Sequence, residues 1–119
     1  MTLWKLCPCD QFTSDRTWYS RKQPHELEAI LNNLARYLSQ LKYAKNSFCV
    51  QSGYLHPEGK GVVAIDQKGG GGNLQETRLY VYADDGKKIL YLITIGNKND
   101  QQTDIKLAHS FADSLKNPP

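Results

Sequence analysis

The stretch TRLYVYADDGKKILYLITI, residues 77–95, decides the fold of this chain. Its two halves, Thr77 to Ala83 and Lys88 to Ile95, are rich in the β-branched and aromatic residues that favour strands. Between them, Asp84-Asp85-Gly86 is a hairpin signal, because glycine readily adopts the positive φ that tight turns need. The stretch therefore predicts two neighbouring antiparallel strands.

Side-chain alternation gives these two strands different places in a sheet. On the first strand Arg78, Tyr80 and Tyr82 share one face, and the opposite face is apolar. The second strand, residues 89–93, is apolar on both faces, which predicts a central position. Another apolar run, Val62 to Ile65, predicts a third strand. The glycines at 69–72 that follow predict a flexible connection, since they lack the residue order of a nucleotide-binding loop.

Helices are predicted on both sides of these strands in the sequence. From Pro24 to Tyr43 apolar residues recur at the i, i+3, i+4, i+7 positions of an amphipathic helix, and Asp104 to Leu115 repeats the pattern. The order predicts an α+β fold: a small antiparallel sheet of three to four strands, with an N-terminal helix region and a C-terminal helix. We expect an all-antiparallel sheet with helices on one side, which leaves the face of Arg78 to a partner.

Length and composition predict a single domain that spans residues 1–119, because 119 residues suit a single core. At 39% hydrophobic and 23% charged residues the chain is of globular type. A short strand is expected at Thr2 to Leu6. The rest of the first 20 residues stays unassigned, and residues 117–119 form a tail.

Location, metal content and charge follow from the same composition. No run approaches the roughly 18 apolar residues of a membrane span, and the N-terminus lacks the apolar core of a signal peptide, so a cytoplasmic protein without membrane contact is expected. Cys7 and Cys9 stand too close together for usual zinc spacing, and with Cys49 they make an odd number. No metal or cofactor is expected. The net charge of +3 permits contact with nucleic acid without requiring it.

The C-terminal half of the chain resembles the RelE/ParE superfamily of toxins. The resemblance covers LHPEGKGVVAID at 55–66 and the row from residue 77 to 116, and it is strongest toward the bacterial addiction-module killer and phage host-inhibition proteins, the HigB-like branch. The matching positions are Gly61 ahead of a strand, Arg78 with Tyr80 and Tyr82, the Asp85-Gly86 turn, Gly96-Asn97-Lys98, and Gln102 with Asp104-Ile105.

The resemblance implies a toxin of a type II toxin-antitoxin system. Such a protein binds messenger RNA on the ribosome, cleaves it as an mRNA interferase without a metal, and is blocked by a cognate antitoxin protein in a hetero-oligomer. Its sheet is expected to cup the RNA, and the helix from Pro24 to Tyr43 fits the family's helical hairpin only loosely. The residues to which it assigns catalysis are Arg78 and Lys98, for charge stabilisation, and His56 is the best histidine for proton transfer. RNA-binding roles fall to Lys60, Lys68, Tyr80 and Tyr82.

The chain also departs from the pattern of the active ribonucleases. The strand from Val62 to Asp66 lacks their lysine pair, and the last helix region offers Asp104 and His109 but no tyrosine. The general acid and base therefore stay unassigned. Two alternatives remain open, a ParE-like inhibitor of DNA gyrase that acts by protein contact and a non-toxic member that only binds RNA or protein.

Structural roles compete with the functional ones at several positions. Arg78 can pair with a carboxylate such as Glu76 or Asp66, and the tyrosines can be cross-strand packing partners. The basic residues Arg21, Lys22, Arg36, Lys42 and Lys45 can form a solvated face or add phosphate contacts.

Overall fold

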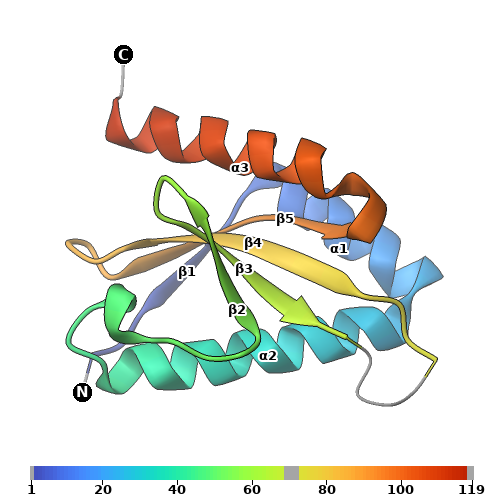
Figure 1. Cartoon of the computed structure of the whole chain (residues 1–119), viewed down its shortest axis with the longest axis horizontal. Coiled ribbons are helices and arrows are strands. Elements are labelled where there is room, and N and C mark those ends of the chain that lie inside the picture. Colours follow the sequence, from blue (N-terminus) through green and yellow to red (C-terminus); the bar gives the residue numbers. More distant parts are fainter. Residues whose placement is uncertain (1, 69–72, 118–119) are drawn as a thin grey trace.

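The computed structural model describes residues 2–68 and 73–117 (Figure 1). Its strands are β1 (Lys5–Pro8), β2 (Leu55–Gly59), β3 (Val62–Gln67), β4 (Thr77–Asp84) and β5 (Ile89–Asn97). Its helices are α1 (Asp10–Lys22), α2 (Pro24–Tyr43) and α3 (Gln101–Lys116), with short 3-10 turns η1 (Ser47–Cys49) and η2 (Lys98–Asp100). The α+β class is confirmed. The predicted glycine connection at 69–72 and the tail residues 118–119 lie outside the described residues.

One five-stranded sheet has the order β1-β5-β4-β3-β2. The predicted hairpin is confirmed, because β4 and β5 pair antiparallel from Thr77 opposite Asn97 to Asp84 opposite Ile89. The pairing shifts by one residue after Tyr80, and Ile93 is the extra residue of β5. The expectation of an all-antiparallel sheet is wrong, since β1 pairs with β5 in parallel. The long connection through α1 and α2 allows this, whereas a tight hairpin does not.

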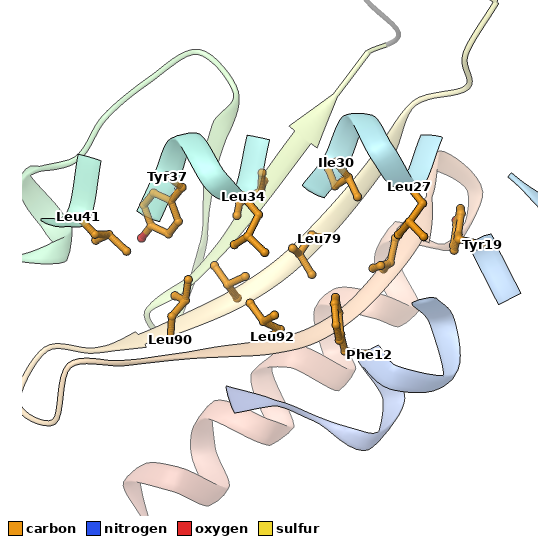
Figure 2. Packing of buried hydrophobic residues seen from close by; sticks show 13 residues of the cluster. Phe12, Tyr19, Leu27, Ile30, Leu34, Tyr37, Leu41, Leu79, Leu90 and Leu92 are labelled. Atoms are coloured by element: carbon orange, nitrogen blue, oxygen red, sulfur yellow. The ribbon is translucent and has the colours of Figure 1, made fainter. Parts of the chain in front are cut away.

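Helices cover both faces of the sheet, α2 on one and α3 on the other (Figure 1). The prediction that the helices share one side is wrong. Helices lie on both faces because β5 is apolar on both and must be covered on both. Figure 2 shows the larger core, whose residues are Phe12, Tyr19, Leu27, Ile30, Leu34, Tyr37, Leu41, Ile65, Leu79, Val81, Leu90, Leu92 and Ile95. The smaller core beneath α3 is made of Val62, Ala64, Tyr80, Ile93, Ala108 and Ala112.

Helix α1 supplies a hydrogen-bond acceptor to the part of the β5 edge that β1 does not pair with. Strand β1 pairs only with residues 89–92 of β5. Beyond that point Asp15 of α1 accepts hydrogen bonds from the backbone N–H of Ile95 (2.9 Å) and from Oγ1 of Thr94 (2.6 Å). A buried donor that loses its acceptor carries its full desolvation cost. Asp15 therefore holds α1 on the sheet.

We expect Asp15→Ala to lower the free energy of unfolding by about 2–3 kcal/mol, because hydrogen bonds to a charged group are worth this much and two donors lose their partner. Urea unfolding followed by circular dichroism measures the change. Ser14→Ala, at an exposed position of the same helix, is the control and should stay near the native value. Equal stability of the two variants would contradict this role of Asp15.

No helix in the described ranges, 2–68 and 73–117, is long and apolar enough to cross a membrane.

Candidate functional site

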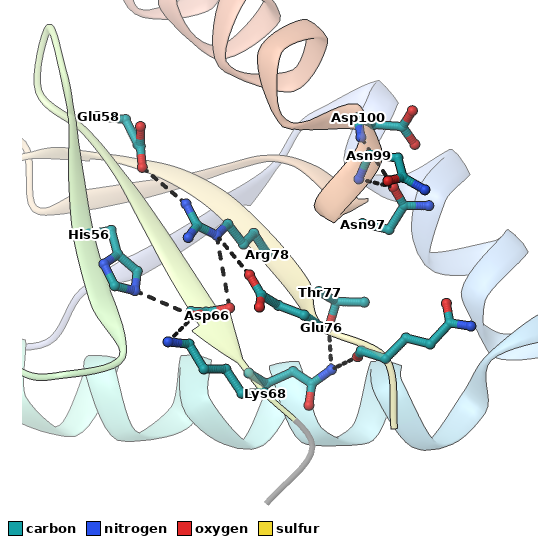
Figure 3. A network of polar contacts seen from close by, with 12 residues as sticks. His56, Glu58, Asp66, Lys68, Glu76, Thr77, Arg78, Asn97, Asn99 and Asp100 are labelled. Atoms are coloured by element: carbon teal, nitrogen blue, oxygen red, sulfur yellow. Dashed lines mark hydrogen bonds and ion pairs between the residues drawn. The ribbon is translucent and has the colours of Figure 1, made fainter. Parts of the chain in front are cut away.

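A single buried carboxylate joins three cationic or titratable side chains on the α3 face of the sheet (Figure 3). Oδ2 of Asp66 lies 3.4 Å from Nε2 of His56 and 3.9 Å from Nζ of Lys68. Oδ1 of the same residue lies 3.9 Å from Nε of Arg78. The sheet register produces this meeting, since Asp66 is the Cα partner of Arg78, and His56 is the partner of Ala64 two residues earlier. Residues two apart on a strand share a face.

Arg78 is held by carboxylates from three strands or their ends. Its Nη1 donates to Oε1 of Glu58 at 3.2 Å, and its Nε lies 3.7 Å from Oε1 of Glu76 as well as near Asp66. The predicted pairing with Glu76 or Asp66 is therefore confirmed. The arginine side chain is only 17% exposed, so these contacts fix its orientation while its charge is more than balanced locally.

Several buried polar atoms around Arg78 have no hydrogen-bond partner in the described part of the chain. They are Nε2 of His56, both carboxylate oxygens of Asp66, Nε of Arg78, the hydroxyl of Tyr80 and Oδ2 of Asp104. Buried polar atoms in proteins are nearly always hydrogen-bonded, so a group of exceptions in one region needs a reason. For His56, Asp66 and Arg78 the reason is that their charged groups face one another as ion pairs, at 3.4 Å and 3.9 Å, which exceeds the length of a short hydrogen bond.

Asp104, in the first turn of α3, extends this row of groups across the sheet. A Cβ atom at Gly96 would lie 1.7 Å from Oδ2 of Asp104, and Gly96 is the Cα partner of Arg78. Burial, and then the charges of Asp100 and Asp15, raise the pKa of Asp104 to about 6. Asp104 therefore changes its protonation near neutral pH, as a general acid or base must.

The charges of Arg78 and Asp104 act in opposite directions on the pKa of Tyr80. Burial is the main reason why the pKa of Tyr80 rises to about 12, and Asp104 adds to the rise while Arg78 opposes it. Its side chain is fully buried beneath α3. The ring faces are therefore covered by protein in this structure, and a nucleotide base cannot stack on them as predicted.

The other predicted RNA-binding and catalytic residues lie apart from Asp66. Lys60 is in the β2–β3 turn, where its Nζ donates to Oδ2 of Asp113 on α3 at 2.7 Å. Tyr82 is partly buried, with Nζ of Lys116 5.5 Å from its ring centroid. Lys98 is exposed in η2, and no ion pair within the described residues joins it to the network.

The β2–β3 turn is fastened to the C-terminal half of α3. Nε2 of His109 lies 2.6 Å from the carbonyl oxygen of Glu58, and Nζ of Lys116 donates to the carbonyl oxygen of Lys60 at 2.6 Å. The hydrogen bond from Lys60 is the main reason why the pKa of Asp113 lies below its usual range. His109 therefore has a structural partner at one of its ring nitrogens.

The cysteines show no arrangement for a metal. Cys7 and Cys9 are partly exposed and Cys49 is exposed, and all three are free thiols. Burial is the main cause that raises the pKa of the Cys9 thiol to about 11, which disfavours the thiolate that metals bind. Among the described residues no three histidine, cysteine, aspartate or glutamate side chains are grouped to hold a metal ion.

The arrangement thus offers one partly exposed histidine beside a buried carboxylate, an oriented guanidinium, a lysine and a carboxyl group that titrates near neutrality. These groups can move protons and stabilise a negative charge on one face of the sheet. No protein-family model matches the chain, and no curated protein sequence matches it either.

Proposed function

We propose that this chain is a RelE/ParE-type toxin of a type II toxin-antitoxin system, which cleaves messenger RNA at the ribosome without a metal and is neutralised by a small antitoxin protein. The observation that carries the proposal is that Asp66 brings together His56, Lys68 and Arg78, all three of which the sequence marked as site residues. Metal-free RNA cleavage requires a base for the 2′-hydroxyl proton, cations for the phosphorane and an acid for the leaving oxygen.

The roles follow from position and exposure. His56, with its side chain 34% exposed and Asp66 beside its ring, is the base that takes the 2′-hydroxyl proton. Arg78 and Lys68 stabilise the charge that develops on the phosphorane. Asp104 donates the proton that the 5′-oxygen takes as it leaves, because its raised pKa keeps it partly protonated near neutrality. The proton acceptor and the proton donor thus lie on either side of Arg78.

The architecture is consistent with this proposal. Helices α1 and α2 are consecutive and precede four of the five strands, β2 to β5, which supports a likeness to the helical hairpin of the resemblance. A sheet of this kind supports more than one activity, so the side chains rather than the fold carry the assignment.

Controlled expression in a bacterial host tests the proposal. We expect the native protein to arrest growth and to produce new messenger-RNA ends, and His56→Ala and Arg78→Ala to abolish both effects. Arg16→Ala is the matched control, because Arg16 is exposed on α1 and lies beside Leu31 and Leu34 of α2, on the opposite face of the sheet from the proposed site. Lys98→Ala, which lies outside the network, should keep the activity. Thermal unfolding of each variant separates loss of function from loss of fold.

Protein contact with DNA gyrase is the second candidate, favoured by the three carboxylates around Arg78, which oppose the approach of a phosphate. Growth arrest without new RNA ends, accompanied by an induced DNA-damage response, would support it. Expression without any growth arrest would contradict the toxin proposal and favour a non-toxic protein that only binds RNA or protein.

A further inference from the structure

Four segments meet at the end of the molecule opposite the Arg78 site: the N-terminal segment, the end of α2, η1 and the β4–β5 turn (Figure 1). The backbone N–H of Thr2 donates to the carbonyl oxygen of Lys42 at 2.9 Å. The backbone N–H of Ser47 donates to Oδ1 of Asp85 at 2.8 Å. These contacts hold the four segments together, and we call this surface the basic aromatic end.

Large apolar side chains are exposed at the basic aromatic end. Tyr43 is 74% exposed and Phe48 is 77% exposed, more than any other aromatic residue in the described ranges. Leu3 is 74% exposed in the N-terminal segment, where it lines a pocket with Leu38 and Lys42 of α2. Nothing in the core requires these rings, because α2 turns a different set of residues to the sheet. Exposed apolar groups that gather in one place mark an interaction surface.

Positive charge gathers at the same end. Its lysines are Lys5, Lys42, Lys45, Lys87 and Lys88. Only Lys88 forms an ion pair within the described residues, at 3.9 Å from Asp85. The two aspartates here already accept backbone hydrogen bonds, Asp84 from Lys87 and Asp85 from Ser47. Five lysines against two aspartates leave a charge of +3, which equals the net charge of the whole chain.

We propose that the basic aromatic end binds single-stranded RNA, with Tyr43 and Phe48 stacking on bases and the lysines contacting phosphates. Exposed rings set among unpaired cations are the means by which proteins bind single strands without reading their sequence. A duplex hides the base faces that the rings would stack on. A membrane surface fits less well, because a membrane-bound helix needs an apolar face toward the lipid, and the apolar face of α2 is buried in the core.

This binding goes beyond the proposed function and is separate from the cleavage site. Arg78 lies near the start of β4 and Asp85 follows its end, so the two regions are about 20 Å apart at the rise of a β-strand. The basic aromatic end can therefore hold one part of a strand while another part reaches Arg78. The proposed binding also assigns a role to Lys42 and Lys45, which take no part in the cleavage site.

Fluorescence anisotropy with a labelled single-stranded RNA of mixed sequence, and with its duplex, tests the proposal on the full chain. We expect Tyr43→Ala combined with Phe48→Ala to weaken binding of the single strand about 10-fold or more. Trp18→Ala is the control, because Trp18 is a 47% exposed aromatic residue on α1. Lys42→Gln combined with Lys45→Gln should reduce the slope of log affinity against log salt by about 1.4 if each lysine neutralises one phosphate.

The Tyr43 and Phe48 double substitution should weaken binding by the same factor with Arg78→Ala as without it, because distant, independent sites contribute additively. Such additivity distinguishes this site from the cleavage site. Cleavage that fails in every form of the protein, with RNA binding intact, would overturn the proposed function alone. Native affinity in the Tyr43 and Phe48 double variant, or equal affinity for the duplex, would overturn the present proposal. So would binding to phosphatidylserine vesicles in place of RNA, or a native dimer that becomes monomeric in that double variant.

Discussion

Replacement of Gly96 with alanine is expected to destabilise the protein by about 3 kcal/mol, at the upper end of the usual cost of overpacking. The added Cβ would lie 1.7 Å from Oδ2 and 2.8 Å from Cγ of Asp104, which is far inside contact distance. Among the described residues only Gly59 and Gly61 are glycines with positive φ, so alanine fits the backbone at 96 and the cost is steric. The start of α3 must move away from the sheet.

A double-mutant cycle checks this mechanism, because the three atoms nearest to the added Cβ belong to Asp104. Urea unfolding of Gly96→Ala, Asp104→Ala and the double variant should show that most of the cost disappears when the carboxyl group is absent. Gly53→Ala, with nothing within 4 Å of the added atom, is the control. A cost that persists in the double variant would show that some other contact, and not Asp104, requires the glycine.

Much of the fold could be predicted from periodic patterns in the sequence. The sequence predicts α2 with the bounds that the structure has, Pro24 to Tyr43, since its long apolar stripe follows the helical period. Helix α1 was not predicted, because only Phe12 and Tyr19 of it are buried and the residues between them are polar. The short edge strands gave weak signals too. β1 was expected at Thr2 to Leu6 and lies at Lys5–Pro8.

The site was predicted in part, for a related reason. Strand alternation places Arg78 on the face opposite the larger core, but it cannot show which element covers that face. Because α3 covers it, Tyr80 is buried rather than available to a base. The sequence indicates Asp66 only as a structural partner of Arg78, and it assigns Asp104 no catalytic role, since their importance depends on contacts between distant segments. A signal that points to a close neighbour is Gly96, because a glycine within a bulky strand indicates close approach by another group.

Asp104→Asn should produce opposite changes in activity and stability. As the proposed proton donor, Asp104 should be worth about 10²–10⁴-fold in the cleavage step, and an amide cannot replace it. Stability should rise instead at neutral pH, because burial opposes the charged carboxylate and the amide has nearly the same shape. Single-turnover cleavage of an RNA substrate and urea unfolding of the same preparations measure the two effects.

The pH dependence of stability gives the sharper test, because its direction follows from the raised pKa of Asp104. The carboxyl group binds its proton more tightly in the folded protein, with a pKa of about 6 against its ordinary value of 3.8. Ionisation therefore costs folding free energy that is absent below about pH 4 and complete above about pH 6. Since solvent screens this half-buried group, we expect the native protein to lose about 1–2 kcal/mol relative to Asp104→Asn between those limits. Asp100→Asn, which should lower the pKa of Asp104 by removing a neighbouring charge, should shrink that loss. Parallel stability curves for the native protein and Asp104→Asn would contradict the raised pKa and, with it, the assignment of Asp104 as the proton donor.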